Sequence, residues 1–342
     1  MRFALTDEQR ALRSMARDVF ADVGSLARLR DVWEGRAETG DVRRKLADSS
    51  LTGIGVREDD GGVGGDELDA AVVLEEAGRA CLPEPLIETL GVVLPLLRDH
   101  APADLRRRWS SAVATGDTTI AVVLGGEPFA VAGTDADAFL LEVDGEVHLI
   151  PAAAVRARGV RSEDPTRDLV AIEDARTSTD TVLPGASPEV AWLRAAAATA
   201  AASVGLADRL LALTVEHASS REQFGQPIGA FQAVQQPLAS VHVAIEAARN
   251  AAWYAAHTRA TGQADADSAA RVAKVAGDEA SALADRVALQ VHAGIGFTWE
   301  HDLHLLLKRA AAWRAAYGDA RTHRAALADV LLARTDDDPS ER

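Results

Sequence analysis

The sequence predicts a mainly α-helical protein with a small β domain in its middle. Three observations support this: helical periodicity near the N-terminus, a β-branched stretch after it, and long alanine-rich runs in the C-terminal half. These changes in pattern divide the 342 residues into four segments. We expect a helical domain (1–115), a small β domain (116–185), a helical bundle (186–334) and a disordered tail (335–342).

The N-terminal domain begins with a helix signal. Thr6 and Gln9 have the spacing of a capping box, and apolar residues then recur every three or four positions. Glycine pairs within 61–65 interrupt this pattern, and a further helix carrying Leu68 ends before Pro83. The sequence therefore predicts several helices in this part of the chain.

The middle segment has the residue pattern of β-strands. Residues 119–124 form a β-branched run, and the apolar runs 139–143 and 147–150 flank Asp144-Gly145-Glu146. Asp-Gly between two apolar runs is a strong hairpin signal. We therefore expect a small antiparallel β domain.

Alanine-rich helices dominate the C-terminal segment. Leu193, Ala197, Ala200 and Val204 recur at steps of three and four, which places small residues on one helix face. Breakers divide this segment into about four long helices, at Gly225, Pro227, Gly262 and Gly294–Gly296. A four-helix bundle that carries the oligomer interface is the predicted outcome. No GxGxxG follows a strand, which excludes a dinucleotide-binding α/β fold.

Composition excludes several classes of function. With 52 acidic and 36 basic residues the net charge is -16, which disfavours nucleic acids and anionic membrane surfaces as partners. The single Cys81 can form neither an internal disulfide nor a cysteine metal site, so we expect a reducing, cytoplasmic location. We expect no membrane span, because apolar runs fall short of the ~20 residues that one needs.

Three segments carry a family resemblance. They read GVREDDGGVGGDELDAAVVLEEAGRA (55–80), SREQFGQPIGAFQAVQ (220–235) and QVHAGIGFTWEHDLHLLLKRA (290–310). They resemble, in order, the PEEYGG-type turn and EELGR helix, the RxxFGxxxxxxQ motif and the QxxGGxGF segment of the acyl-CoA dehydrogenase family. Within that family the chain is similar to the short subunits of actinobacterial heteromeric enzymes. The resemblance implies an N-terminal helical domain, a β-barrel-like domain and a C-terminal four-helix bundle.

The resemblance also implies a reaction and its partners. Enzymes of the family remove an α-proton and a β-hydride from an acyl-CoA thioester, with a carboxylate as base and the flavin N5 as hydride acceptor. We therefore expect an acyl-CoA substrate, an FAD cofactor and an electron-transfer flavoprotein as electron acceptor. A homologous subunit is the expected protein partner, in a hetero-oligomer.

Five residues match the family's cofactor contacts. By resemblance, Arg221 grips the flavin diphosphate of a neighbouring subunit, a task that suits the two parallel donors of a guanidinium. Phe224 matches the aromatic near the adenine, and Gln232 matches an amide contact. Gln290 and Gly294 match the segment where the backbone approaches the cofactor closely.

The chain departs from the family pattern in three places. Ala293 replaces the first glycine of the QxxGG segment. The TEPxxGSD-like loop of the flavin cradle reads VVLGGEPFAVAGTDADAF (122–139), without the threonine and serine in their places. Neither usual base position carries glutamate, since the turns read Tyr317-Gly318-Asp319-Ala320 and Thr261-Gly262. Asp319 is the candidate catalytic base, and a helix N-cap is its equal alternative.

Two functions from different classes remain open. In the first, the chain is a subunit of a heteromeric acyl-CoA dehydrogenase that desaturates a bulky or steroid side-chain CoA thioester. In the second, it is a structural partner without flavin contact, and a homo-oligomeric enzyme using Asp319 is a minor third. We expect no metal site, because His292, His301 and His304 lack an HExxH pattern and a cysteine companion.

Overall fold

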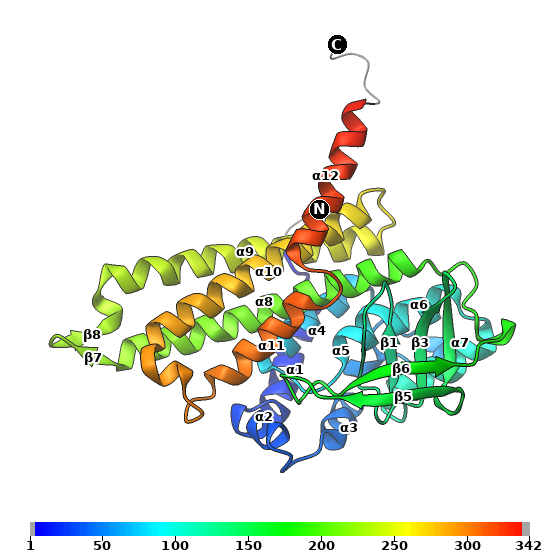
Figure 1. The fold of residues 1–342 in the computed structure, drawn as a ribbon, viewed down its shortest axis with the longest axis horizontal. Coiled ribbons are helices and arrows are strands. Elements are labelled where there is room, and N and C mark those ends of the chain that lie inside the picture. Colours follow the sequence, from blue (N-terminus) through cyan, green and yellow to red (C-terminus); the bar gives the residue numbers. More distant parts are fainter. Residues whose placement is uncertain (1–3, 337–342) are drawn as a thin grey trace.

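The computed structural model describes residues 4–336, with helical regions at both ends of the chain and one large sheet between them in sequence (Figure 1). Helix makes up 64% of the chain. Globular proteins average roughly one third, so the prediction of a mainly α protein with a small β region is confirmed.

Helices build the N-terminal region, and a capping box opens the first of them. The Thr6 hydroxyl accepts from the Gln9 N–H and the Gln9 side chain accepts from the Thr6 N–H, both at 3.2 Å, as predicted. The elements are α1 (Asp7–Val23), α2 (Leu26–Trp33), α3 (Gly40–Asp48), η1 (Leu51–Gly53), η2 (Glu58–Asp60), α4 (Glu67–Ala80), α5 (Leu86–Glu88), the π-helical η3 (Thr89–Val93), α6 (Leu94–His100) and α7 (Ala103–Ala114).

The sheet is mixed, which corrects the expectation of a purely antiparallel domain. Its strand order is β4-β3-β1-β2-β6-β5, and β1 pairs with β3 in parallel. A parallel pair needs a crossover of about a dozen residues, and here residues 124–137, which include β2, provide it. The strands are β1 (Ile120–Val123), β2 (Ala130–Val131), β3 (Ala138–Val143), β4 (Glu146–Pro151), β5 (Val155–Val160) and β6 (Leu169–Ala175), with η4 (Ala152–Ala154) and η5 (Thr179–Thr181) as short helical turns.

The predicted hairpin is confirmed. Strands β3 and β4 pair antiparallel, with Val143 opposite Glu146 and only Asp144-Gly145 between them. Both turn residues have positive φ, 51° and 81°. This is the conformation of the two-residue turn for which Asp-Gly is favoured.

Long helices form the C-terminal region. Helices α8, α9 and α10 pack against one another, while α11 packs on α8 and α10, and α12 packs on α10. The elements are α8 (Pro188–Ser220), the hairpin strands β7 (Glu222–Gln223) and β8 (Gln226–Pro227), η6 (Ile228–Ala230), α9 (Gln232–Ala260), α10 (Ala266–His292), η7 (Ala293–Phe297), α11 (Leu303–Ala315) and α12 (Ala320–Asp336). The predicted tail begins at Thr335, but α12 continues to Asp336, and residues 337–342 lie outside the described part of the chain.

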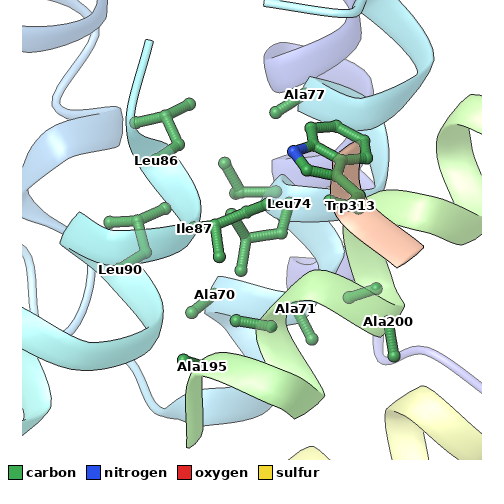
Figure 2. Packing of buried hydrophobic residues seen from close by; sticks show 14 of the residues in the cluster. Ala70, Ala71, Leu74, Ala77, Leu86, Ile87, Leu90, Ala195, Ala200 and Trp313 are labelled. Carbon is green, nitrogen blue, oxygen red and sulfur yellow. The ribbon is translucent and has the colours of Figure 1, made fainter. Parts of the chain in front are cut away.

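Helices α4 and α8 approach each other backbone to backbone. A side chain at Gly78 would overlap the backbone of Ala202, and one at Gly205 would overlap the carbonyl oxygen of Glu75. Alanines of both helices, such as Ala70 and Ala195, belong to the same buried core (Figure 2). The alanine-rich face predicted from the sequence thus permits this close contact and fixes the N-terminal region on the bundle.

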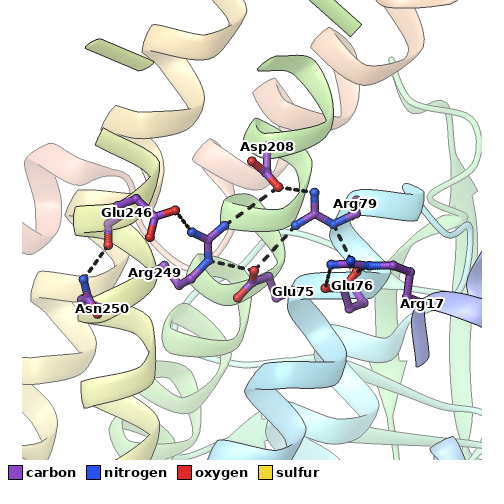
Figure 3. A network of polar contacts seen from close by, with 8 residues as sticks. All are labelled: Arg17, Glu75, Glu76, Arg79, Asp208, Glu246, Arg249 and Asn250. Carbon is purple, nitrogen blue, oxygen red and sulfur yellow. Dashed lines mark hydrogen bonds and ion pairs between the residues drawn. The ribbon is translucent and has the colours of Figure 1, made fainter. Parts of the chain in front are cut away.

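Buried ion pairs tie the same helices together (Figure 3). Glu75 and Glu76 of α4 are 2% and 1% exposed. Glu75 accepts from Arg249 of α9 at 2.9 Å, and Glu76 accepts from Arg17 of α1 at 2.8 Å and from Arg79 at 3.1 Å. The EEAGR part of the first family-like segment is therefore structural, because its charges join α1, α4 and α9.

Helix α8 corrects the expectation that no segment is long and apolar enough to cross a membrane. Its mean hydropathy reaches 1.4 over 18 residues, because alanine dominates the helix. However, 78% of that window is buried inside the protein. Among the described residues, α8 is the one helix long and apolar enough to cross a membrane, and its burial makes it a core helix.

Candidate functional site

The RxxFG motif forms an exposed hairpin at the end of α8. The Arg221 N–H closes the helix by donating to the His217 carbonyl at 2.9 Å, and the Ile228 N–H then donates to the Arg221 carbonyl at 2.8 Å. Phe224 and Gly225 make the turn between β7 and β8, both with positive φ. Positive φ is strained for a bulky residue, yet the Phe224 side chain is 93% exposed. The fold thus holds an aromatic ring in solvent in a strained conformation.

The other three predicted cofactor residues lie at the same end of the bundle. Gln232 begins α9, Gln290 lies in the last turn of α10, and Gly294 follows in η7. All three are exposed, and a side chain added at Gly294 would meet no atom within 4 Å. Stacked rings of His217 and His292, 4.3 Å apart, hold the ends of α8 and α10 together. The structure therefore brings both motifs to one end.

We call this end the bundle tip and define it by Arg221, Phe224, Gln232, Gln290 and Gly294. In Figure 1 the hairpin β7–β8 lies at the opposite end of the long axis from the β sheet. The hairpin part of the tip therefore lies away from this chain's own sheet.

The tip has the chemistry of an anion contact. Within residues 4–333, whose side chains the structure describes, no carboxylate pairs with the Arg221 guanidinium, and the side chain is exposed. An unpaired guanidinium offers two parallel charged donors that match a diphosphate. Beside Gln290, an open groove of about 600 Å³ runs along α10 to Phe297, with Arg286 and the ion pair of Arg314 with Asp285 in its walls. Arg221 and Arg286 fit the diphosphate end of a dinucleotide such as FAD.

Ala293 adopts a backbone conformation that favours glycine. Its φ is 52° and its ψ is -136°, a region that residues with a side chain rarely enter. The family pattern has glycine at this place, so this departure from the pattern falls on a backbone conformation that suits glycine better than alanine. The strain lies directly beside Gly294, whose outer face is open.

Asp319 is a helix cap in this structure. Its Oδ1 accepts from the N–H and the hydroxyl of Thr322, both at 2.8 Å, at the start of α12. These hydrogen bonds lower the pKa of the exposed Asp319 carboxyl. A base in an acyl pocket would have its pKa raised by desolvation, whereas the Asp319 side chain turns to the helix N-terminus. Its assignment as catalytic base stays a prediction.

A carboxylate that the sequence analysis did not single out lies near the same turn. Glu127 is half-buried, and burial raises its pKa against the opposing effect of the Tyr317 and Gly318 N–H groups. The Trp192 indole N–H also faces it, although it is buried and makes no hydrogen bond of standard geometry. The retained Glu127-Pro128 pair in the altered TEPxxGSD-like loop was the available signal for this residue.

A groove of about 570 Å³ separates the sheet from α11, and Glu127 lies in its wall. Alanines of α11 leave this space open, whereas Arg167 lines the opposite side. Next to it, the buried Arg309 of α11 pairs with Asp164 and donates to the Leu82 carbonyl at 2.8 Å. One arginine thereby joins the N-terminal region, the β region and α11.

His292, His301 and His304 make local hydrogen bonds to the backbone. The His292 Nδ1 lies 2.8 Å from the Ala288 carbonyl oxygen, and the His304 Nδ1 lies 2.9 Å from the His301 carbonyl oxygen. The His301 ring accepts from the Leu303 N–H at 3.1 Å. In the described part of the chain, no group of three histidine, cysteine, aspartate or glutamate side chains could hold a metal ion.

Comparison with known proteins gives consistent matches. The acyl-CoA dehydrogenase N-terminal and C-terminal domain families match residues 6–117 and 192–332. The chain is 38% identical over 255 residues to acyl-CoA dehydrogenase IpdE2 of Mycobacterium tuberculosis, and this match covers 75% of each protein.

Solved structures share the fold. A Tcur3481-Tcur3483 steroid ACAD variant is 25% identical, with a TM-score of 0.85 over 97% of this chain and 99% of that one. The ChsE4-ChsE5 complex of Mycobacterium tuberculosis is 23% identical, with a TM-score of 0.85 over 99% of this chain and 100% of that one. The second likeness concerns the fold alone.

Proposed function

Because this chain belongs to the acyl-CoA dehydrogenase family, we propose that it is one subunit of a heteromeric acyl-CoA dehydrogenase and completes a flavin site seated mainly in a partner chain. Family members are FAD-dependent oxidoreductases that act on CH–CH bonds. When bound, the flavin would supply the acceptor for the hydride that leaves the β-carbon of the thioester. The residues of this chain bind and orient that cofactor.

One observation carries the proposal. The five tip residues are exposed, they lie together at one end of the bundle, and Figure 1 places that end away from this chain's own sheet. In the proposed assembly, Arg221 holds the flavin diphosphate, Phe224 packs at the adenine end, and Gln290 contacts the cofactor from α10. Gln232 and Gly294 complete the contact surface.

Relatives support a heteromeric assembly and a bulky substrate. Two solved structures of the same fold contain paired proteins, Tcur3481-Tcur3483 and ChsE4-ChsE5, and the first is described as a steroid ACAD. We therefore propose a longer homologous subunit as partner and a bulky, steroid-like acyl-CoA as substrate. An electron-transfer flavoprotein is the proposed electron acceptor.

The base belongs to the partner in this proposal. Asp319 has a lowered pKa and caps α12, and both features make it a weak base. A carboxylate of the partner then takes the α-proton, while this chain positions the cofactor. Asp319 remains the candidate base of this chain by its place in the sequence alone.

Flavin retention tests the proposal. The chain is purified alone and together with its longer homologous subunit, and the flavin absorbance of each preparation is measured. We expect a nearly colourless chain alone and a yellow complex with about one flavin per heterodimer. Arg221→Ala removes a charged contact that contributes ~1.5–3 kcal/mol, so FAD affinity should fall about 10- to 150-fold.

Arg44→Ala is the matched control. Arg44 is also exposed and lies on α3, far from the tip in sequence and in the fold. A stable yellow homo-oligomer with one flavin per chain would contradict the proposal. If a complex forms and both arginine variants keep their flavin, the chain is the structural partner without flavin contact.

A further inference from the structure

Three histidines meet beneath the bundle tip. His217 lies in the last turn of α8, His292 ends α10, and His301 precedes α11. The rings of His217 and His292 stack at 4.3 Å with 22° between their planes. His301 contacts the His292 ring edge-on, at 4.8 Å and 63°. We call these three side chains the histidine cluster.

One imidazole nitrogen of the cluster is buried and has no partner. His292 is 3% exposed, and its Nδ1 lies 2.8 Å from the Ala288 carbonyl oxygen. A carbonyl only accepts, so Nδ1 carries the proton of the neutral ring. Nε2 is then a bare nitrogen without a hydrogen bond. A buried polar atom of this kind is uncommon in folded proteins and points to a missing partner.

The charges that reach the cluster are basic. Burial lowers the pKa of His217, and His301 and Arg221 lower it further. Burial lowers the pKa of His292 against its backbone hydrogen bond, with His217 and His301 adding to the effect. No carboxylate contributes to either shift in the described part of the chain.

Neighbouring elements do not supply a negative charge either. Asp302, the residue after His301, pairs with Arg30 of α2 at 2.6 Å. His304 on α11 is the next titratable group, and it adds a further potential positive charge. In a chain of net charge -16, this spot combines one arginine with three imidazoles, and none of the four forms an ion pair with a carboxylate whose side chain the structure describes.

We propose that the histidine cluster and Arg221 together form an anion site for the diphosphate of a flavin nucleotide, and that binding this anion drives proton uptake by the cluster. The inference rests on the proposed function, because it names further binding residues at the same tip. A bound anion favours the protonated imidazole, and protonation favours the anion in return. Protonated His292 also gains an N–H at the bare Nε2.

A pH dependence follows with a defined sign. Above the imidazole pKa values the site holds the anion through Arg221 alone, and below them through Arg221 and imidazolium. Affinity for the diphosphate should therefore rise as the pH falls, by up to about tenfold per pH unit for each proton taken up. Repulsion among three protonated rings sets the limit of this rise.

The test measures FAD release from the co-purified complex at pH 8, 7 and 6. We expect tighter FAD retention at pH 6 than at pH 8 in the wild type, and a flattened dependence in His217→Gln. His257→Gln, a half-buried histidine at the far end of α9, should keep the wild-type dependence. Thermal unfolding of each variant confirms that the fold is intact.

A second readout does not depend on the variants. Imidazole proton resonances of the wild-type complex, stripped of flavin, are followed by NMR against pH with and without inorganic pyrophosphate. We expect pyrophosphate to raise the pKa of His217, with the distant His257 serving as the reference resonance.

The outcomes separate the inference from the function on which it rests. If Arg221→Ala releases FAD but wild type and His217→Gln share one pH dependence, the inference is wrong and the proposed function stands. Unchanged imidazole pKa values in pyrophosphate contradict the inference as well. If Arg221→Ala keeps its flavin, the proposed function itself fails.

Discussion

The two family-like arginine segments differ in what surrounds their charges. At the crossing of α4 with α8 and α9, Arg79 and Arg249 face the buried carboxylates of Glu75 and Glu76. At the bundle tip, Arg221 is exposed and unpaired within the residues whose side chains are described. The charges of the first arrangement stabilise the fold, whereas the guanidinium of the second is available to a ligand. A motif therefore has to be read with its neighbours.

The largest expected effect of a substitution is at the buried crossing. Glu76→Ala removes the charged hydrogen bonds that Arg17 and Arg79 donate to one carboxylate, a loss of about 1.5–3 kcal/mol, because Arg17 is half-exposed and Arg79 keeps Asp208 as a partner. Urea unfolding measures this loss. Glu216→Ala, on the exposed surface of α8, serves as control and should change the free energy of unfolding by less than about 0.5 kcal/mol. Equal losses of unfolding free energy in Glu76→Ala and Glu216→Ala would contradict the structural role of the buried crossing.

A methyl group added at the same crossing should also destabilise the fold. Gly78→Ala forces α4 away from the Ala202 backbone, and overpacking of this kind costs about 1–3 kcal/mol. Gly294→Ala adds the same methyl at the tip, where no atom lies within 4 Å. We expect thermal unfolding to shift for the first variant only, while the second weakens FAD binding in the complex.

Substitutions of Asp319 distinguish a helix-capping role from a catalytic one. Asparagine caps helices about as well as aspartate, and alanine loses about 0.5–2 kcal/mol at an N-cap. We therefore expect Asp319→Ala to lower the unfolding free energy by that amount, and Asp319→Asn to leave both stability and substrate-dependent flavin bleaching of the complex intact. Abolished bleaching in Asp319→Asn, with flavin still bound, would return the base to this chain.

The smallest expected effect concerns acid stability without ligand. The pKa values of His217 and His292 lie below 6.5 in the fold, so their contribution is present above pH 6.5 and is lost as the pH falls through the folded values. Asp278 and Asp285, whose pKa values burial raises to about 6, act in the opposite direction. The effect of His217 is therefore measured by comparing the variant with the wild type. Between pH 7.5 and 5.5, the melting temperature of His217→Gln should fall less steeply than that of the wild type.

Local signals in the sequence were sufficient for much of the fold. The Thr6 capping box and the Asp144-Gly145 hairpin follow from residues adjacent in the chain, and both are confirmed. The parallel pairing of β1 with β3 could not be predicted, because it depends on which strands meet in the folded sheet. Small-residue periodicity predicted a closely packed helix face but not that Gly78 and Gly205 make the closest approach.

The candidate site was less predictable than the fold. The structure brings Arg221, Phe224 and Gln290, which the motifs singled out, to one end of the bundle, but their exposure and the lack of a described counter-ion are tertiary properties. Asp319 lies where the sequence suggests, yet its side-chain direction decides its pKa. The histidine cluster joins residues 75 positions apart in α8 and α10, so spacing along the chain gave no sign of it.

The central claim is that this chain lends its bundle tip to a flavin held by another chain. The structure of the co-purified complex with FAD bound tests this most directly. Our account predicts the diphosphate of FAD against Arg221, with Phe224 at its adenine end and the isoalloxazine inside the partner subunit. A flavin enclosed between this chain's own sheet and α11, with the hairpin β7–β8 free in solvent, would contradict it.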